Sequence, residues 1–164
     1  SAGHSRNELA RVKIAIDDDL VIQAIAVLEH VADIGAYPVC PAAMDAMLQA
    51  LAATRTAGRR IAVLGEMLEL GDAAVALHES CGRAAARCGV DVLVAVGGPA
   101  ADGVIAGAVA AGLPAERTRR YPDAASACAP VTALVGAGDL VLVKGSRGTK
   151  TDLIADALQA GGAA

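Results

Sequence analysis

The sequence is almost free of aromatic side chains. It has 164 residues, no tryptophan and no phenylalanine, and its two tyrosines are Tyr37 and Tyr121. Proteins that bind single-stranded nucleic acid stack bases on aromatic rings, so this scarcity disfavours such a module. The formal net charge of −4 provides no basic excess for binding a duplex. We therefore expect no nucleic-acid partner, and a core built from Ala, Val, Leu and Ile.

Paired cysteines and long apolar runs are also missing. Cysteine occurs four times, and no two cysteines form a Cys-x-x-Cys pair. Because structural zinc sites use closely spaced ligands, we expect no metal site. Reduced thiols are typical of the cytoplasm, which is the expected location. No apolar run reaches the roughly 18 residues that span a bilayer, so we expect no membrane partner.

Short apolar segments alternate with segments of helical periodicity. Strands are expected at 11–16, 59–65, 90–98, 118–122 and 138–146. Helices are expected at 17–32, 42–55, 73–89, 100–112, 123–135 and 149–159. Continuous apolar strands that alternate with helices are typical of a parallel sheet covered on both faces. The sequence therefore predicts an α/β fold, a three-layer Rossmann-like domain with a mostly parallel sheet and helices on both faces.

Local residues refine three of these helices. The aspartates at 17–19 are interpreted as acids that cap the first helix, in preference to a metal site. Gly89 is expected to end the helix at 73–89 in the left-handed conformation that glycine adopts readily. Pro130 is expected to break the helical run at 123–135.

The carboxyl ends of the predicted strands carry most of the candidate chemistry. In sheets of this kind ligands bind at that edge. The last strand ends in Lys144-Gly-Ser-Arg-Gly148, whose glycine spacing does not fit the Walker phosphate-binding loop. Lys144, Ser146 and Arg147 suit the recognition of a carboxylate or phosphate. The alternative is a tight strand-to-helix turn with solvated basic residues.

A second candidate loop, Gly-Glu-Met-Leu-Glu-Leu-Gly at 65–71, follows the strand at 59–65. Glu66 or Glu69 could fix a ligand amine or orient a neighbouring cation. Equally, both could be solvated loop carboxylates, with His78 on the surface of the next helix. The spacing of these residues leaves both interpretations open.

Three of these motifs, taken together, resemble the C-terminal domain of the Mur ligases of peptidoglycan synthesis. They are the loop at 65–71, Leu77-His78, and the run at 144–148, in an order and spacing that match the family. The resemblance covers about residues 36–160. We accordingly expect residues 31–164 to form the family's domain and residues 1–30 to form a divergent segment of one strand and one helix.

The resemblance implies an ATP-dependent, amide-forming ligase that adds D-alanyl-D-alanine to a UDP-muramoyl tripeptide. Its C-terminal domain binds the dipeptide and closes over ATP and magnesium held by the central ATPase domain, which is the implied partner. This chain alone is expected to be inactive, with no catalytic residue and no tightly bound cofactor. The implied substrate-binding residues are Lys144, Ser146, Arg147 and Glu66, and the implied nucleotide contact is Tyr37.

One stretch departs from the family pattern. Around Tyr37, the positions where the family has Asp and two Asn are Gly35, Pro38 and Cys40. A second interpretation therefore stays open: a stand-alone or engineered α/β module that keeps the fold but not the reaction. Such a module could self-associate as a homodimer through an unpaired edge strand in its N-terminal segment.

Overall fold

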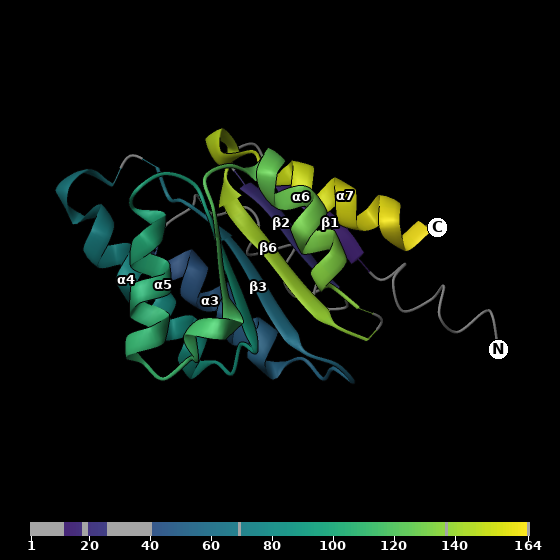
Figure 1. The fold of residues 1–164 in the computed structure, drawn as a ribbon, viewed down its shortest axis with the longest axis horizontal. Helices are drawn as coiled ribbons and strands as arrows, with labels where there is room; N and C mark the ends of the chain where they lie inside the picture. The colour runs from purple at the N-terminus through teal and green to yellow at the C-terminus, as the bar shows by residue number, and fades with distance from the viewer. Residues whose placement is uncertain (1–11, 18–19, 26–40, 69, 137, 164) are drawn as a thin grey trace.

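The computed structural model describes residues 12–17, 20–25, 41–68, 70–136 and 138–163. Its strands are β1 (Val12–Asp17), β2 (Leu20–Ile25), β3 (Arg60–Gly65), β4 (Val92–Val96), β5 (Thr118–Tyr121) and β6 (Leu140–Ser146). Its helices are α3 (Pro41–Ala53), α4 (Ala74–Arg87), α5 (Ala101–Ala110), α6 (Ala124–Leu134) and α7 (Asp152–Ala163). Helices α3, α4 and α5 cover one face of the sheet, and α6 and α7 cover the other (Figure 1). The predicted three-layer α/β class is confirmed.

The sheet has the strand order β1-β2-β6-β3-β4-β5. Strands β6, β3, β4 and β5 are parallel, whereas β1 and β2 form an antiparallel hairpin that pairs with β6 through β2. The chain runs outward from β3 to β5 and then returns to β6 on the other side of β3. This reversal creates a crevice at the carboxyl ends of β3 and β6, where open α/β sheets bind ligands.

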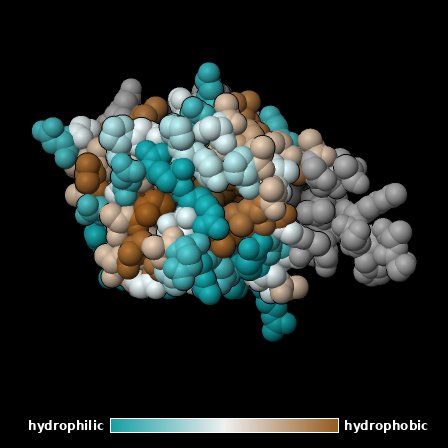
Figure 2. Space-filling view, in the orientation of Figure 1, coloured by the Kyte–Doolittle hydropathy of each residue, from teal (hydrophilic) through white to brown (hydrophobic). Residues whose placement is uncertain are grey.

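The central strands form the core. Residues 61–65 of β3 and all of β4 are buried, as expected for parallel strands covered on both faces. The outer strand β5 is more polar, and its Arg119 is exposed. Figure 2 shows a line of hydrophilic residues that crosses the face of the molecule seen in that view. Charged side chains on an edge strand hinder pairing with another molecule.

The helix predicted at 17–32 is wrong over the residues that the structure describes. Leu20–Ile25 is strand β2, which pairs with β1 on one side and β6 on the other. The cap interpretation of the aspartates fails with it, since Asp17 ends a strand and pairs with Leu20. Val21, Ile22 and Ile25 fit a strand as well as a helix, and ladder pairing with β6 decides between them. Residues 18–19 and 26–40 lie outside the described residues.

The expected break at Pro130 is also wrong. Helix α6 runs from Ala124 to Leu134 with Pro130 inside it. Proline removes one helical hydrogen bond, but the buried side chains of Ala127 and Val131 hold the helix against the sheet on either side of it. The other helices described lie within a few residues of their predicted ranges.

The glycine cap predicted at the end of α4 is confirmed, and replacing this glycine should lower the stability of the fold. Gly89 has φ = +80°, and the N–H of Val90 donates to the carbonyl of Ala85 at 3.2 Å. Nothing lies within 4 Å of a Cβ built on Gly89. Gly89→Ala should therefore lower the free energy of unfolding by about 1 kcal/mol, from backbone conformation alone. Urea denaturation measures this, and a loss above about 2 kcal/mol would contradict a purely conformational role.

Candidate functional site

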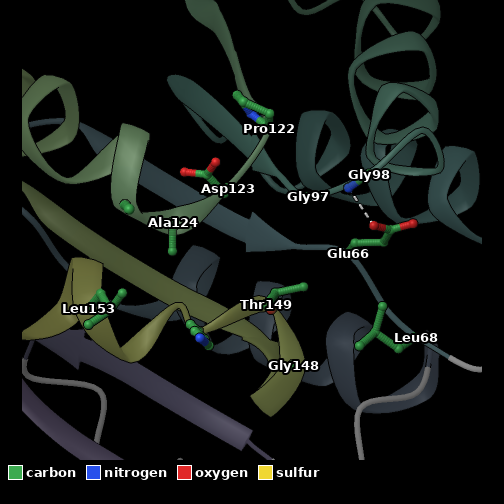
Figure 3. A pocket seen from close by; sticks show the side chains of 12 residues that line it. Glu66, Leu68, Gly97, Gly98, Pro122, Asp123, Ala124, Gly148, Thr149 and Leu153 are labelled. Atoms are coloured by element: carbon green, nitrogen blue, oxygen red, sulfur yellow. Dashed lines mark hydrogen bonds between the residues drawn. The ribbon is translucent and has the colours of Figure 1, made fainter.

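A cavity of about 430 Å³ lies at the carboxyl edge of the sheet. The loops that follow all four parallel strands contribute to it, as the close-up shows (Figure 3). The lining residues are Glu66, Leu68, Gly97, Gly98, Pro122, Asp123, Ala124, Ala125, Gly148, Thr149, Lys150 and Leu153. The cavity thus lies at the edge of the sheet where ligand binding is expected, and the loops after β4 and β5 line it together with the two predicted loops.

Glu66 forms one wall of the cavity and is held on both sides. Its N–H donates to the carbonyl of Val96 at 2.8 Å, which extends the pairing of β3 with β4 by one residue. Its carboxylate accepts a hydrogen bond from the N–H of Gly98, the dashed line in Figure 3. Glu66 is therefore a fixed carboxylate at the cavity wall, not a freely solvated loop residue.

The Gly97–Gly98 turn before α5 fits closely around Glu66. Gly97 has φ = +139°, and a Cβ built there would lie 2.5 Å from the Cβ of Glu66. On the other side, Arg120 donates to the carbonyl of Gly98 at 2.6 Å and to Asp102 at 2.7 Å. The turn is therefore closely packed, and this packing also shapes the cavity.

The charged lining residues have mixed signs. Asp123 caps α6, since its carboxylate accepts from the N–H of Ser126 at 2.7 Å. Hydrogen bonds from Ser126 hold the pKa of Asp123 below its ordinary value, so the carboxylate is ionised at neutral pH. Lys150 is exposed and has φ = +53°, a conformation that few non-glycine residues adopt. The cavity therefore presents an ammonium group together with two carboxylates.

Two glycines allow the strand tips to meet at the base of the site. A Cβ built on Gly65 would lie 2.8 Å from Oγ1 of Thr149 and 3.0 Å from the Cα of Gly145. A Cβ on Gly145 would lie equally close to Thr149. The loop after β6 therefore folds back directly over the tips of β3 and β6, and only glycine leaves room for it.

Of the predicted substrate-binding residues whose side chains the structure describes, one lines the cavity and one does not. Glu66 lines the cavity. Lys144 is fully buried within β6 and is not among the lining residues, so its contact with a ligand stays a prediction. Ser146 ends β6 and Arg147 begins the short turn after it, but their side chains lie outside the described part. Tyr37 and Glu69 also lie outside it.

Asp123 and Lys150 line the cavity but are not among the residues predicted from the sequence. Asp123 follows the short strand β5 directly, and an Asp between a strand and a helix is a recognisable cap. Lys150 has no local pattern that distinguishes it, because its place on the cavity depends on how the loop after β6 folds back.

The described residues offer neither a cluster of metal ligands nor, in the buried Cys81, a reactive thiol. They contain no group of three or more His, Cys, Asp or Glu side chains placed to hold a metal ion. Burial raises the pKa of Cys81 to about 12, so this thiol stays protonated and is a poor nucleophile. None of the helices described is long and apolar enough to cross a membrane.

Comparison with known proteins identifies relatives of this domain. Residues 28–147 match the family model described as Mur ligase, glutamate ligase domain. The UDP-N-acetylmuramoyl-tripeptide–D-alanyl-D-alanine ligase of Mycobacterium tuberculosis is 41% identical over 144 residues. That match covers 76% of this chain but only 28% of the relative.

Solved structures agree with this result. A MurF structure from Acinetobacter baumannii superposes with a TM-score of 0.64 at 28% identity, over 76% of this chain and 27% of that one. The MurF ligase from Thermotoga maritima, in complex with ADP, has the same fold, with a TM-score of 0.59 at 23% identity. It covers 77% of this chain and 27% of that one.

Proposed function

The chain belongs to the Mur ligase family, and from this premise we propose that it is the C-terminal domain of a ligase that adds D-alanyl-D-alanine to a UDP-muramoyl tripeptide. In that reaction ATP phosphorylates a carboxylate of the tripeptide, and the amine of the dipeptide displaces the phosphate to form an amide. We assign the dipeptide to the cavity at the strand ends. The ATP and UDP-sugar substrates place the whole ligase in the cytoplasm.

The charge pattern of the cavity is the observation that supports this assignment. A free dipeptide carries one ammonium and one carboxylate. Lys150 can attract the carboxylate, and Glu66 and Asp123 can attract the ammonium. Among the described lining residues the side-chain charges sum to −1, which disfavours the polyphosphate of ATP. ATP is therefore assigned to the central domain of the ligase, with this domain closing over it.

Closure explains why the chain is expected to be inactive alone. It spans 28% of the length of its mycobacterial relative, and it contains no Walker loop of its own. An acyl phosphate is lost to water unless the site is closed, and a second domain that carries the amine can close it. The magnesium ion and the phosphoryl transfer are assigned to the central domain.

Calorimetric titration of the chain with D-alanyl-D-alanine, and separately with ATP and magnesium, tests the proposal. We expect weak, saturable binding of the dipeptide only.

Lys150→Asn should weaken binding of the dipeptide about 2- to 5-fold, since asparagine tolerates the left-handed backbone but removes a solvent-screened charge contact. Arg147→Ala should leave the fold nearly intact and abolish binding of the dipeptide, and ligation in the full-length enzyme.

The matched control is Arg117→Ala, which removes an exposed cation before β5, at the opposite end of that strand from the cavity. Equal weakening in Arg117→Ala and Lys150→Asn would show a nonspecific charge effect and contradict the assigned site. A folded chain that binds no dipeptide would also contradict it. If light scattering then found a dimer, the self-associating module would be favoured, because β1 is the outermost strand of the sheet among the described residues.

A further inference from the structure

The loop that leaves β3 is anchored by a histidine that does not line the cavity. The N–H of Met67 donates to Nε2 of His78 at 2.8 Å. His78 belongs to α4 and is fully buried, so the interpretation of it as a surface residue is wrong. The hydrogen bond from Met67 therefore ties the loop after β3 to the buried side of α4.

Two hydrogen bonds fix the protonation state of the imidazole. Because Nε2 accepts from Met67, it carries no proton. Nδ1 lies 2.6 Å from the carbonyl oxygen of Ala74, one turn earlier in α4, so Nδ1 carries the proton and donates it there. The ring is therefore neutral, in a single tautomer, and bridges the first turn of α4 to the loop.

Helices α4 and α5 hold His78 between them. A Cβ built on Gly103 of α5 would lie 3.2 Å from the Cβ of His78. The backbone of α5 thus packs directly against the histidine. Met67, which is only 2% exposed, is therefore bonded to a histidine that two packed helices hold.

The anchored residue lies between two residues of the cavity wall. Glu66 and Leu68 flank Met67, and both line the cavity. In Figure 3 their side chains project from the same short loop. If the Met67 amide is released, Glu66 keeps its hydrogen bonds to Val96 and Gly98, but the loop loses its anchor between Glu66 and Leu68, and the cavity wall can shift there.

We propose that His78 is a positioning residue for the amine substrate: its Nε2 holds the Met67 amide so that Glu66 and Leu68 keep the cavity wall in place. This inference rests on the proposed function, since the ligand of the cavity is taken to be the dipeptide. The histidine touches no substrate and transfers no proton.

Two substitutions separate positioning from mere structural support. The amide oxygen of Gln can take the place of Nε2, so His78→Gln keeps the acceptor for Met67 and loses the donor to Ala74. The amide nitrogen of Asn can take the place of Nδ1, so His78→Asn keeps that donor and loses the acceptor. Each variant is neutral and loses one buried hydrogen bond, and the two should show similar falls in Tm.

Binding of D-alanyl-D-alanine should then differ between the variants. We expect about tenfold weaker binding for His78→Asn, because a misplaced wall residue costs affinity at that scale, and less than about twofold for His78→Gln. Equal loss in both variants would reduce His78 to a structural residue. Unchanged binding in His78→Asn would overturn the proposal.

Amide hydrogen exchange, followed by NMR, tests the anchor without any ligand. In the unsubstituted chain the Met67 amide should be protected, it should stay protected in His78→Gln, and it should exchange faster in His78→Asn. An unprotected Met67 amide in the unsubstituted chain overturns the inference even if a variant fails to fold. Protection at Met67 without any binding of the dipeptide would instead overturn the proposed function and the substrate role that rests on it.

Discussion

Gly107→Ala is expected to lower the free energy of unfolding by about 2–4 kcal/mol, although alanine is the better helix former. A Cβ built on Gly107 would lie 1.9 Å from the carbonyl oxygen of Glu79 and 2.7 Å from its carbonyl carbon. Those atoms belong to the backbone of α4, so they cannot turn aside as a side chain would. Helices α4 and α5 must separate, and the buried contacts between them weaken.

A glycine of α4 lies equally close to the backbone of α5. A Cβ on Gly82 of α4 would lie 1.9 Å from the carbonyl oxygen of Val104 in α5. Each helix thus presents a glycine to the backbone of the other, and Gly82→Ala should cost about as much as Gly107→Ala.

Chemical denaturation of the two variants measures these losses. The matched control is Ala106→Ser, at an exposed position next to Gly107, which should change stability by less than about 0.5 kcal/mol. Stability that rises in Gly107→Ala, as helix propensity alone predicts, would refute the close approach of the helices. Separation of α4 from α5 should also displace His78, and so weaken binding of the dipeptide.

Asp139→Ala is the second substitution with a large expected effect, about 2–4 kcal/mol of lost stability. The carboxylate of Asp139 accepts from the N–H of Arg59 at 2.8 Å, from the guanidinium of Arg59 at 2.8 Å, and from the N–H of Gly136 at 2.9 Å. It therefore ties the start of β3 to the turn before β6, at the edge opposite the cavity. Alanine leaves these donors without their acceptor.

The same carboxylate makes stability depend on acid pH. Burial raises the pKa of Asp139, but hydrogen bonds from Arg59 and Gly136 lower it by more, so the net shift is downward. A lowered pKa in the folded state stabilises the fold fully above the ordinary value of about 3.9, and the contribution is lost as the pH falls through the folded value. The Tm of the unsubstituted chain should therefore fall as the pH drops below about 4.

Asp139→Asn is the control for this second prediction. It keeps an acceptor oxygen at nearly the same volume, so it should lose less stability than Asp139→Ala at neutral pH. It removes the titrating group, so its stability should fall less steeply in acid than that of the unsubstituted chain. Parallel curves for the two proteins would show that other carboxylates cause the acid loss.

Strand and helix positions in the parallel part of the sheet could be predicted because burial leaves a local pattern. Five apolar residues in a row at 92–96, bounded by polar and glycine residues, indicate a strand covered on both faces. Gly89 follows the last turn of α4 and predicts its own left-handed conformation. The hairpin of β1 and β2 could not be predicted in this way, because Leu20–Ile25 becomes a strand by pairing with β6, more than a hundred residues away.

In the candidate site, too, some residues could be predicted from local sequence and others could not. Glu66 could be found from its place directly after a buried strand. The burial of Lys144 could not, since whether the end of a strand is exposed depends on which helices and loops cover it. Nor could the task of His78, since its hydrogen bond to Met67 requires α4 to pack beside the loop that leaves β3.

The sequence by itself determined the fold class, the edge of the sheet that carries the candidate ligand loops, and the family, because apolar periodicity and short motifs are local properties of the chain. The tertiary structure alone decided which charged residues face a common cavity and which are buried. It also decided that α4 and α5 touch through Gly82 and Gly107. These outcomes depend on distances between residues that are remote in sequence, and packing of the whole domain fixes such distances.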